Sequence, residues 1–300
     1  MARAVTISGY GSPSVLRAAD VEIPAPGAGQ IRVAVRYAGV GPTDLAIRAG
    51  HLDAVYPVRP GGILGFEAAG VVETVGADVT GVAPGDEVAV FLPQSLGGYA
   101  ELVNADFWVP KPAAVPWTVA AALPASGEAA VRTLDQLGVA AGETLLLLGG
   151  SGSVGAIATQ LAVARGAKVI SAVRPSEFAF ATSLGGQPID YQRPLADSVL
   201  SPVDAVLDAS GRSDLWAAVA LAGGPSRVIT LADHRAAELG VALSGPVPAG
   251  IPAALRQSMD AVAAGTLSLR EPTVFPLEQA AEVHARLEGG ALRGKALLSL

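Results

Sequence analysis

Cysteine is absent from this chain of 300 residues. Its absence excludes disulfides, thiolate nucleophiles, iron–sulfur clusters and every zinc site that uses a thiolate ligand. Histidine is scarce as well, because only His51, His234 and His284 are present, and they are far apart in the sequence. None of them stands in a metal-ligand spacing. The sequence therefore predicts no metal site.

Charged residues make up only 16% of the chain, and they give a net charge of −7. The 20 Lys and Arg residues form no cluster, so we expect no nucleic-acid partner. Apolar residues reach 51%, which is too high for a disordered chain and sufficient for a large core. At about 150 residues per domain, the length predicts two domains.

Residues 144–164 carry no formal charge and are long enough to raise the question of a membrane span. Gly and Ser residues at 149–153 interrupt this stretch, so a strand followed by a glycine turn explains it better. The N-terminus lacks the long apolar core of a secretory signal. We therefore expect a cytoplasmic protein with no membrane partner.

The first third of the chain is rich in Gly, Pro and β-branched residues. Residues 31–37 alternate apolar and polar side chains, which is typical of a half-buried strand. Further strands are predicted at 70–75, 86–91 and 99–103, separated by Gly and Pro residues. The pattern predicts a strand-rich, barrel-like domain.

From Pro116 the chain becomes helical, and then short apolar strands alternate with helices. The predicted strands are 144–148, 168–173, 203–207 and 227–231, and the helices between them are 154–165, 176–184 and 215–221. This alternation predicts an α/β fold with a doubly wound parallel sheet, which binds ligands at the carboxyl ends of its strands. A helix at 277–287 and a strand at 296–300 follow.

The motif G-x-G-x-x-G begins directly after the strand 144–148 and leads into an apolar helix. Its first glycine allows a tight turn, its second admits a pyrophosphate close to the backbone, and its third lets helix and strand pack closely. The helix N-terminus offers free N–H groups to the anion. The sequence predicts a dinucleotide site formed by Gly150, Ser151, Gly152, Ser153, Val154 and Gly155.

The end of the following strand distinguishes NAD from NADP. A site for NAD usually carries Asp or Glu there, to bind the ribose 2′-hydroxyl. This chain has no acidic residue before Glu177, and Arg174 stands where a guanidinium can pair with a 2′-phosphate. Ser171 and Ser176 are candidates for additional hydrogen bonds. We therefore predict NADPH as the cofactor, although Arg174 can also be a solvated loop residue.

Several catalytic classes lack their residues. No G-x-S-x-G elbow, no Tyr with Lys four positions later and no Gly-Lys-Ser/Thr loop is present. Hydride transfer without a metal remains.

Motifs along nearly the whole chain resemble the zinc-free quinone oxidoreductase branch of the medium-chain dehydrogenase/reductase superfamily. Their order and spacing make the resemblance specific. They include Gly39-Val40-Gly41-Pro42-Thr43-Asp44, Gly65-Phe66-Glu67, Gly97-Gly98-Tyr99-Ala100-Glu101, the cofactor turn and Gly294-Lys295.

The resemblance implies a GroES-like β-barrel domain at 1–118 and 266–300 and a Rossmann domain at 119–265. It implies a homodimer that reduces quinones, enones or enoyl compounds as small-molecule substrates. Residues 228–231 are our candidate for a strand that pairs across the dimer. The resemblance also implies that Gly41, Ala129 and Lys295 lie at the cofactor, although members usually carry Asn and Thr at the first two positions.

Reduction of a conjugated carbonyl needs a hydrogen-bond donor for the oxygen that gains charge. Tyr56, His51 and Gln94 are the candidates, besides water, and each also has a structural explanation. Because Gly41 and Ala129 lack the usual side chains, an NADPH-binding protein with little turnover, acting as a structural or redox-sensing partner, is the alternative function.

Overall fold

The structure is a computed structural model that describes residues Met1–Leu300 and divides into two compact units. The first unit comprises Met1–Ala125 and Arg270–Leu300, and the second comprises Ser126–Leu269. The sequence analysis placed these limits at 118 and 266. Helix α2 (Trp117–Ala122) lies near the first limit and belongs to the first unit, because it packs on strands of that unit.

The first unit contains a sheet in the order β14-β15-β3-β4-β5-β7, with β6 also paired to β3. Strand β3 (Ile31–Val40) is central, and its alternate residues Ile31, Val33 and Val35 are buried, as the period-2 pattern predicts. Strand β15 (Ala296–Ser299) pairs with β3, so a segment far along the chain completes this sheet.

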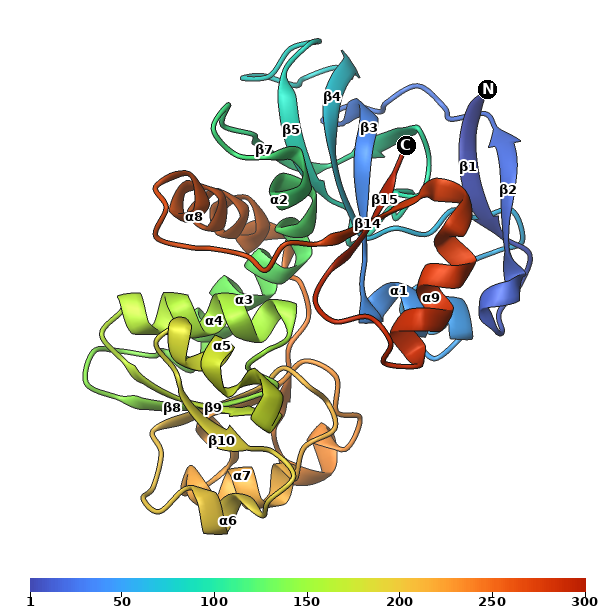
Figure 1. The fold of residues 1–300 in the computed structure, drawn as a ribbon. Helices are drawn as coiled ribbons and strands as arrows, with labels where there is room; N and C mark the ends of the chain where they lie inside the picture. Colours follow the sequence, from blue (N-terminus) through green and yellow to red (C-terminus); the bar gives the residue numbers. More distant parts are fainter. The chain divides into compact units, whose positions relative to one another are not determined.

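The remaining strands of the first unit are β1 (Ala2–Ile7), β2 (Leu16–Val21), β4 (Glu67–Val75), β5 (Glu87–Phe91), β6 (Leu102–Ala105), β7 (Phe107–Pro110) and β14 (Thr273–Pro276). Strands β1 and β2 form a separate antiparallel pair. Its other α-helices are α1 (Pro42–Ala49) and α9 (Ala280–Glu288), which contact each other. Figure 1 shows α9 beside α1 and the β1-β2 pair.

The second unit is the predicted doubly wound parallel sheet, in the order β10-β9-β8-β11-β12-β13. Its strands are β8 (Thr144–Leu148), β9 (Lys168–Val173), β10 (Gln187–Asp190), β11 (Ala205–Asp208), β12 (Val228–Thr230) and β13 (Ala242–Leu243). Its helices are α3 (Pro124–Leu137), which enters from the first unit, α4 (Ser153–Ala164), α5 (Phe178–Ser183), α6 (Leu195–Ser198), α7 (Leu215–Leu221) and α8 (Ile251–Ala263). In Figure 1, α4 and α5 cover one face of β8, β9 and β10, and α6 and α7 lie on the other.

Strand β8 lies at the centre of this sheet, and its four leucines at 145–148 are at most 1% exposed. Burial of each leucine contributes on the order of 2 kcal/mol to stability. The next strand along the chain, β9, pairs on one side of β8, and β11 pairs on the other. The strand order therefore reverses at β8, which is where doubly wound sheets bind their ligands.

The predicted edge strand and the uncharged stretch 144–164 both lie in the second unit. Residues 228–231 are not the edge of the sheet, because β12 pairs with β11 on one side and with β13 on the other. The uncharged stretch 144–164 divides into β8, a turn and the 12-residue helix α4. None of the helices has both the length and the apolar character that crossing a bilayer requires.

Candidate functional site: a dinucleotide turn and a buried charge cluster

The glycine turn joins β8 to α4 at the carboxyl edge of the second sheet. Gly149, rather than Gly150, adopts the left-handed conformation, with φ of +86°. At Gly150 the constraint is different, because a Cβ there would lie 1.8 Å from Ser171 Oγ and 3.1 Å from Ser171 Cβ, so the Ser171 side chain would have to shift. Gly155 permits the close packing that the motif predicts, since its Cβ would lie 2.3 Å from Gly149 O. The contact at Gly155 is with backbone atoms, so that position excludes any larger residue.

The N-terminus of α4 is open to a ligand. Its N-cap, Gly152, is exposed and has no side chain that could cap the helix. The first intrahelical bond runs from the Ala156 N–H to Gly152 O, so the N–H groups at 153–155 precede it. Uncapped N–H groups and the positive end of the helix dipole together favour an anion such as a pyrophosphate.

The residues predicted to distinguish NADP from NAD follow β9. Arg174 and Ser176 are exposed, and the Arg174 guanidinium makes no ion pair. Glu177, the first acidic residue after the strand, is buried. Ser171 is buried completely beneath Gly150, and its hydroxyl has no hydrogen-bond partner. The structure therefore presents Arg174 and Ser176 at the surface but does not bring Ser171 to them.

Asp208, which ends β11 on the same edge of the sheet, is a site residue that was not predicted from the sequence. One carboxylate oxygen accepts hydrogen bonds from Ser210 N at 3.0 Å, Ser210 Oγ at 2.8 Å and Gly211 N at 3.2 Å. The other accepts from Thr230 Oγ1 at 2.8 Å. Asp208 thereby shapes the loop after β11, which packs on the glycine turn at Gly149. An Asp at the end of a buried strand, followed by Ala-Ser-Gly, was the available signal.

Ala129 lies in α3 within the second unit and is 8% exposed. Its methyl group cannot form a hydrogen bond, and its carbonyl accepts one from Thr133 Oγ1 at 2.7 Å. Ala129 therefore has no side-chain group that could form the hydrogen bond expected of the Thr that family members usually carry at this position.

The three candidate donors of the first unit differ in burial. His51 and Gln94 are exposed, and their side chains make no hydrogen bond. Tyr56 is half-buried and packs edge-on against Phe66, with ring centroids 5.4 Å apart. No contact unites the three in one cluster of donors.

A buried charge cluster lies under Gly41 in the first unit. Lys295 forms an ion pair with Glu67, and the two side chains are 9% and 1% exposed. Glu67 also accepts a hydrogen bond from Ala125 N at 2.8 Å. Asp44 Oδ2 accepts one from Gly41 N at 2.8 Å, while Asp44 Oδ1 is buried without a partner. We refer to Asp44, Glu67 and Lys295 as the charge cluster.

Burial, with a smaller contribution from neighbouring Glu67, raises the pKa of Asp44 to about 7, although the Gly41 hydrogen bond and Lys295 lower it. The Asp44 carboxyl therefore holds a proton for part of the time near neutral pH. The structure shows the Lys295 ammonium against Glu67, and the place of Lys295 at the cofactor, which the resemblance implies, stays a prediction.

A second buried group joins Tyr99, His284 and Arg48. The Tyr99 hydroxyl lies 3.1 Å from His284 Nε2. Arg48 donates to Gly11 O at 2.6 Å and pairs with Glu288. Burial, assisted by the positive Arg48, lowers the pKa of His284 to about 3, and burial raises that of Tyr99 well above its usual range. His284 is therefore uncharged, and these side chains contribute to the packing of helix α9.

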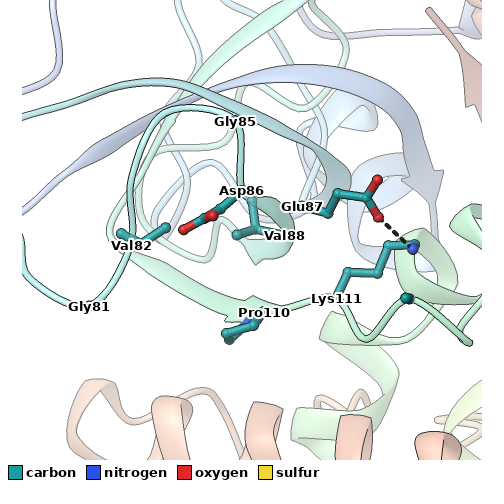
Figure 2. A pocket seen from close by; sticks show the side chains of 9 residues that line it. Gly81, Val82, Gly85, Asp86, Glu87, Val88, Pro110 and Lys111 are labelled. Atoms are coloured by element: carbon teal, nitrogen blue, oxygen red, sulfur yellow. Dashed lines mark hydrogen bonds and ion pairs between the residues drawn. The ribbon is translucent and has the colours of Figure 1, made fainter.

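A recess of about 450 Å³ opens elsewhere on the first unit, and Figure 2 shows its lining. Lys111 Nζ lies 2.7 Å from Glu87 Oε2 at its edge and 4.6 Å from the centre of the Trp117 ring. None of the predicted site residues lines this recess. It is formed by Gly81, Val82, Gly85, Asp86, Glu87, Val88, Pro110, Lys111 and Ala113.

Two domain families match the chain. The alcohol dehydrogenase GroES-like domain matches residues 27–112, within the first unit, and the zinc-binding dehydrogenase family matches residues 184–298. The second family is named for zinc, but this chain has no cysteine. No group of three or more His, Asp or Glu side chains is placed to hold a metal ion.

The chain is 31% identical over 241 residues to 2-methylene-furan-3-one reductase of Solanum lycopersicum, covering 76% of this chain and 62% of that protein. It is 34% identical over 227 residues to a quinone oxidoreductase of Pseudomonas aeruginosa, covering 72% of this chain and 68% of that protein. The chain spans only 53% to 62% of the length of three of the curated relatives that it matches.

Among solved structures, the quinone oxidoreductase from Coxiella burnetii is similar over the whole chain. Its TM-score is 0.88 at 27% sequence identity, with 100% of this chain and 99% of that one covered.

Proposed function

Because this chain belongs to the zinc-free quinone oxidoreductase branch of the medium-chain dehydrogenase/reductase superfamily, we propose that it uses NADPH to reduce a quinone or the C=C bond of a conjugated enone or enoyl compound. The observation that carries the proposal is the uncapped N-terminus of α4 directly after the buried strand β8, with an unpaired Arg174 at the end of the neighbouring strand.

The chain's own residues have distinct tasks in this proposal. The N–H groups at 153–155 bind the pyrophosphate, and Ser151 and Ser153 offer hydroxyl groups beside it. Arg174 pairs with the 2′-phosphate, and Ser176 adds a hydrogen bond from the same exposed segment. Glu177, the first acidic residue after β9, is buried and therefore does not compete for a ribose hydroxyl.

Bound NADPH supplies a hydride to the β-carbon of the enone or to the quinone. The protein must then stabilise the negative charge that develops on the substrate carbonyl oxygen, which requires a donor within hydrogen-bond distance. It must also hold the alkene at near-attack distance from the hydride donor. Of the three candidates from the sequence, Tyr56 is the most restrained, because it packs against Phe66.

The test is NADPH oxidation by the purified protein, followed by absorbance, with a panel of quinones, enones and enoyl thioesters and with EDTA present throughout. We expect turnover with at least one substrate class and no effect of EDTA. Tight NADPH binding without turnover across the panel would favour the alternative, a binding protein with a structural or redox-sensing role. Glycine at 41 and alanine at 129 are the residues that motivate this alternative.

A further inference from the structure

Gly41 leaves an unfilled slot above the charge cluster. Apart from its chain neighbours, a Cβ built on Gly41 would have two atoms within 4 Å, Lys295 Nζ at 3.5 Å and Asp44 Oδ2 at 3.8 Å. Its φ of −134° is accessible to every residue, so the backbone does not demand glycine here. Gly41 is itself half-buried rather than enclosed. The absence of a side chain at Gly41 therefore leaves the Lys295 ammonium accessible to a ligand.

The Lys295 ammonium is fixed in place and retains unused donors. Glu67 is its one protein acceptor, and an ammonium has three N–H groups. The other oxygen of Glu67 is held by the Ala125 N–H. Since the Lys295 side chain is only 9% exposed, this ion pair stands in surroundings where a hydrogen bond to a charged group is stronger than in water. Two donors therefore remain for a ligand in the slot.

Asp44 does not consume these donors. One of its oxygens accepts from Gly41 N, and the other, Oδ1, is buried with no partner at all. Its raised pKa means that part of the population is uncharged near neutral pH, so Lys295 is balanced mainly by Glu67. The slot is thus bordered by buried polar groups that have hydrogen-bonding capacity left unused.

We infer that Lys295 is a catalytic residue, whose ammonium enters the slot beside Gly41 and donates a hydrogen bond to the carbonyl oxygen of the quinone or enone. The inference rests on the proposed function and identifies the donor that the function requires. It assigns Lys295 to the substrate rather than to the cofactor, and it replaces the exposed His51 and Gln94 as candidates.

Hydride transfer and protonation by solvent together complete the reduction. When the hydride bonds to the β-carbon, the C=C electron pair moves toward the carbonyl and leaves an enolate oxygen, which the ammonium stabilises without losing its proton. A proton from water then bonds to the α-carbon, and NADPH has become NADP⁺. With a quinone, the hydride and one solvent proton give the hydroquinone. A fixed cation at the developing charge is the kind of preorganised stabilisation that lowers such barriers.

The experiment separates this role from the structural role of the ion pair. Lys295→Met alone would leave Glu67 buried without its partner, which destabilises a protein. The double variant Lys295→Met/Glu67→Gln removes both charges and keeps an acceptor for Ala125 N. The control is Lys111→Met/Glu87→Gln, because the Lys111 side chain is also buried, at 4% exposed, in the same unit but lies at the recess of Figure 2, where its partner Glu87 is 43% exposed. Melting temperature, NADPH dissociation constant and kcat are measured for each protein.

We expect the Lys295 double variant to bind NADPH as the wild type does, while kcat with the best substrate falls about a hundredfold or more, as for removal of one oxyanion donor. The Lys111 double variant should keep the wild-type kcat. Gly41→Leu fills the slot without changing any charge, and we expect the same loss of kcat, with a melting temperature lowered only by the poorer N-cap that Leu gives α1. If the double variant does not fold, the kcat of Gly41→Leu tests the inference on its own.

Three outcomes overturn the inference. A kcat within threefold of wild type in a folded double variant, or in Gly41→Leu, removes Lys295 from catalysis. A weaker NADPH affinity with unchanged kcat returns Lys295 to the cofactor. In both cases the proposed function stands, because the wild-type enzyme is active. A wild-type protein without turnover on any substrate overturns the proposed function itself, and this inference with it.

Discussion

The hydroxyl of Tyr99 and the Nε2 atom of His284 meet 3.1 Å apart inside the first unit, where both side chains are fully buried. Their rings cross edge to face, with centroids 5.9 Å apart. Nδ1 of the same histidine has no partner, and Arg48 lies close enough to disfavour a second proton on the ring. His284 is therefore held as a neutral imidazole on helix α9.

This arrangement predicts acid sensitivity. The pKa of His284 is lowered to about 3 in the folded protein, so between pH 6.5 and 3 only the unfolded chain binds the proton. The free energy of unfolding then falls as the pH falls, by up to about 1.4 kcal/mol per pH unit from this group. His284→Gln cannot take up this proton, and urea unfolding across that range should show a shallower decline for it. Parallel curves for variant and wild type would contradict the assignment.

Asp44 should act in the opposite direction. Its pKa is raised to about 7, so between pH 4 and 7 the folded protein holds a proton that the unfolded chain has lost. This group therefore makes the free energy of unfolding decrease as the pH rises through that window. In Asp44→Asn the contribution disappears, and the stability of the variant relative to wild type should increase from pH 4 to pH 8 by on the order of 4 kcal/mol. A constant difference across the range would show that the carboxyl ionises normally.

Arg174→Ala tests the cofactor preference. The guanidinium is exposed and unpaired, so its loss should leave folding unchanged while removing a charge-assisted bond to the 2′-phosphate. We expect KM for NADPH to rise about ten- to a hundredfold and KM for NADH to change little. Lys168→Ala is the matched control, because Lys168 is an exposed cation at the opposite end of β9. An equal loss with both coenzymes would remove Arg174 from the phosphate site.

Two glycines of the turn should respond differently to the same added methyl group. In Gly155→Ala the new Cβ would lie 2.3 Å from Gly149 O, and the backbone must move, so both stability and NADPH binding should fall. Gly152 has an ordinary φ of −72°, and its nearest neighbour would be at 3.3 Å. Gly152→Ala should therefore fold like the wild type and still lose at least about tenfold in NADPH affinity, because the methyl group obstructs the phosphate. Calorimetric titration and thermal melts of both variants distinguish the two roles.

The second unit, in which strands alternate with helices, was predictable because the sequence patterns that indicate its elements are local. Strands β8 and β9 combine continuous apolar runs with glycine turns, and the sequence analysis placed both at the residues where they occur. Strand β10 escaped prediction because Pro188 and polar neighbours make it look like a loop, which an edge strand tolerates. Helix α8 was missed although Ile251, Leu255 and Met259 recur at helical spacing and are buried.

The site residues likewise divide into those that the local sequence predicts and those that it does not. The glycine turn and Arg174 are read from neighbouring residues, so a sequence pattern is enough to propose them. The charge cluster is not, because Glu67 and Lys295 are far apart in the sequence and come together through the pairing of β4 and β15 with β3. Burial of Ser171 was equally hidden, since it depends on the approach of Gly150 from the preceding strand.

That pairing has a consequence for how the protein is made. Residues 37–40 of β3 find their β15 partner only when residues 296–299 have been synthesised, after the whole second unit has left the ribosome. Until then an incomplete row of backbone donors and acceptors stays exposed to other nascent chains. We expect the nucleotide unit to mature first during translation, and the other unit to need protection until its last strand arrives.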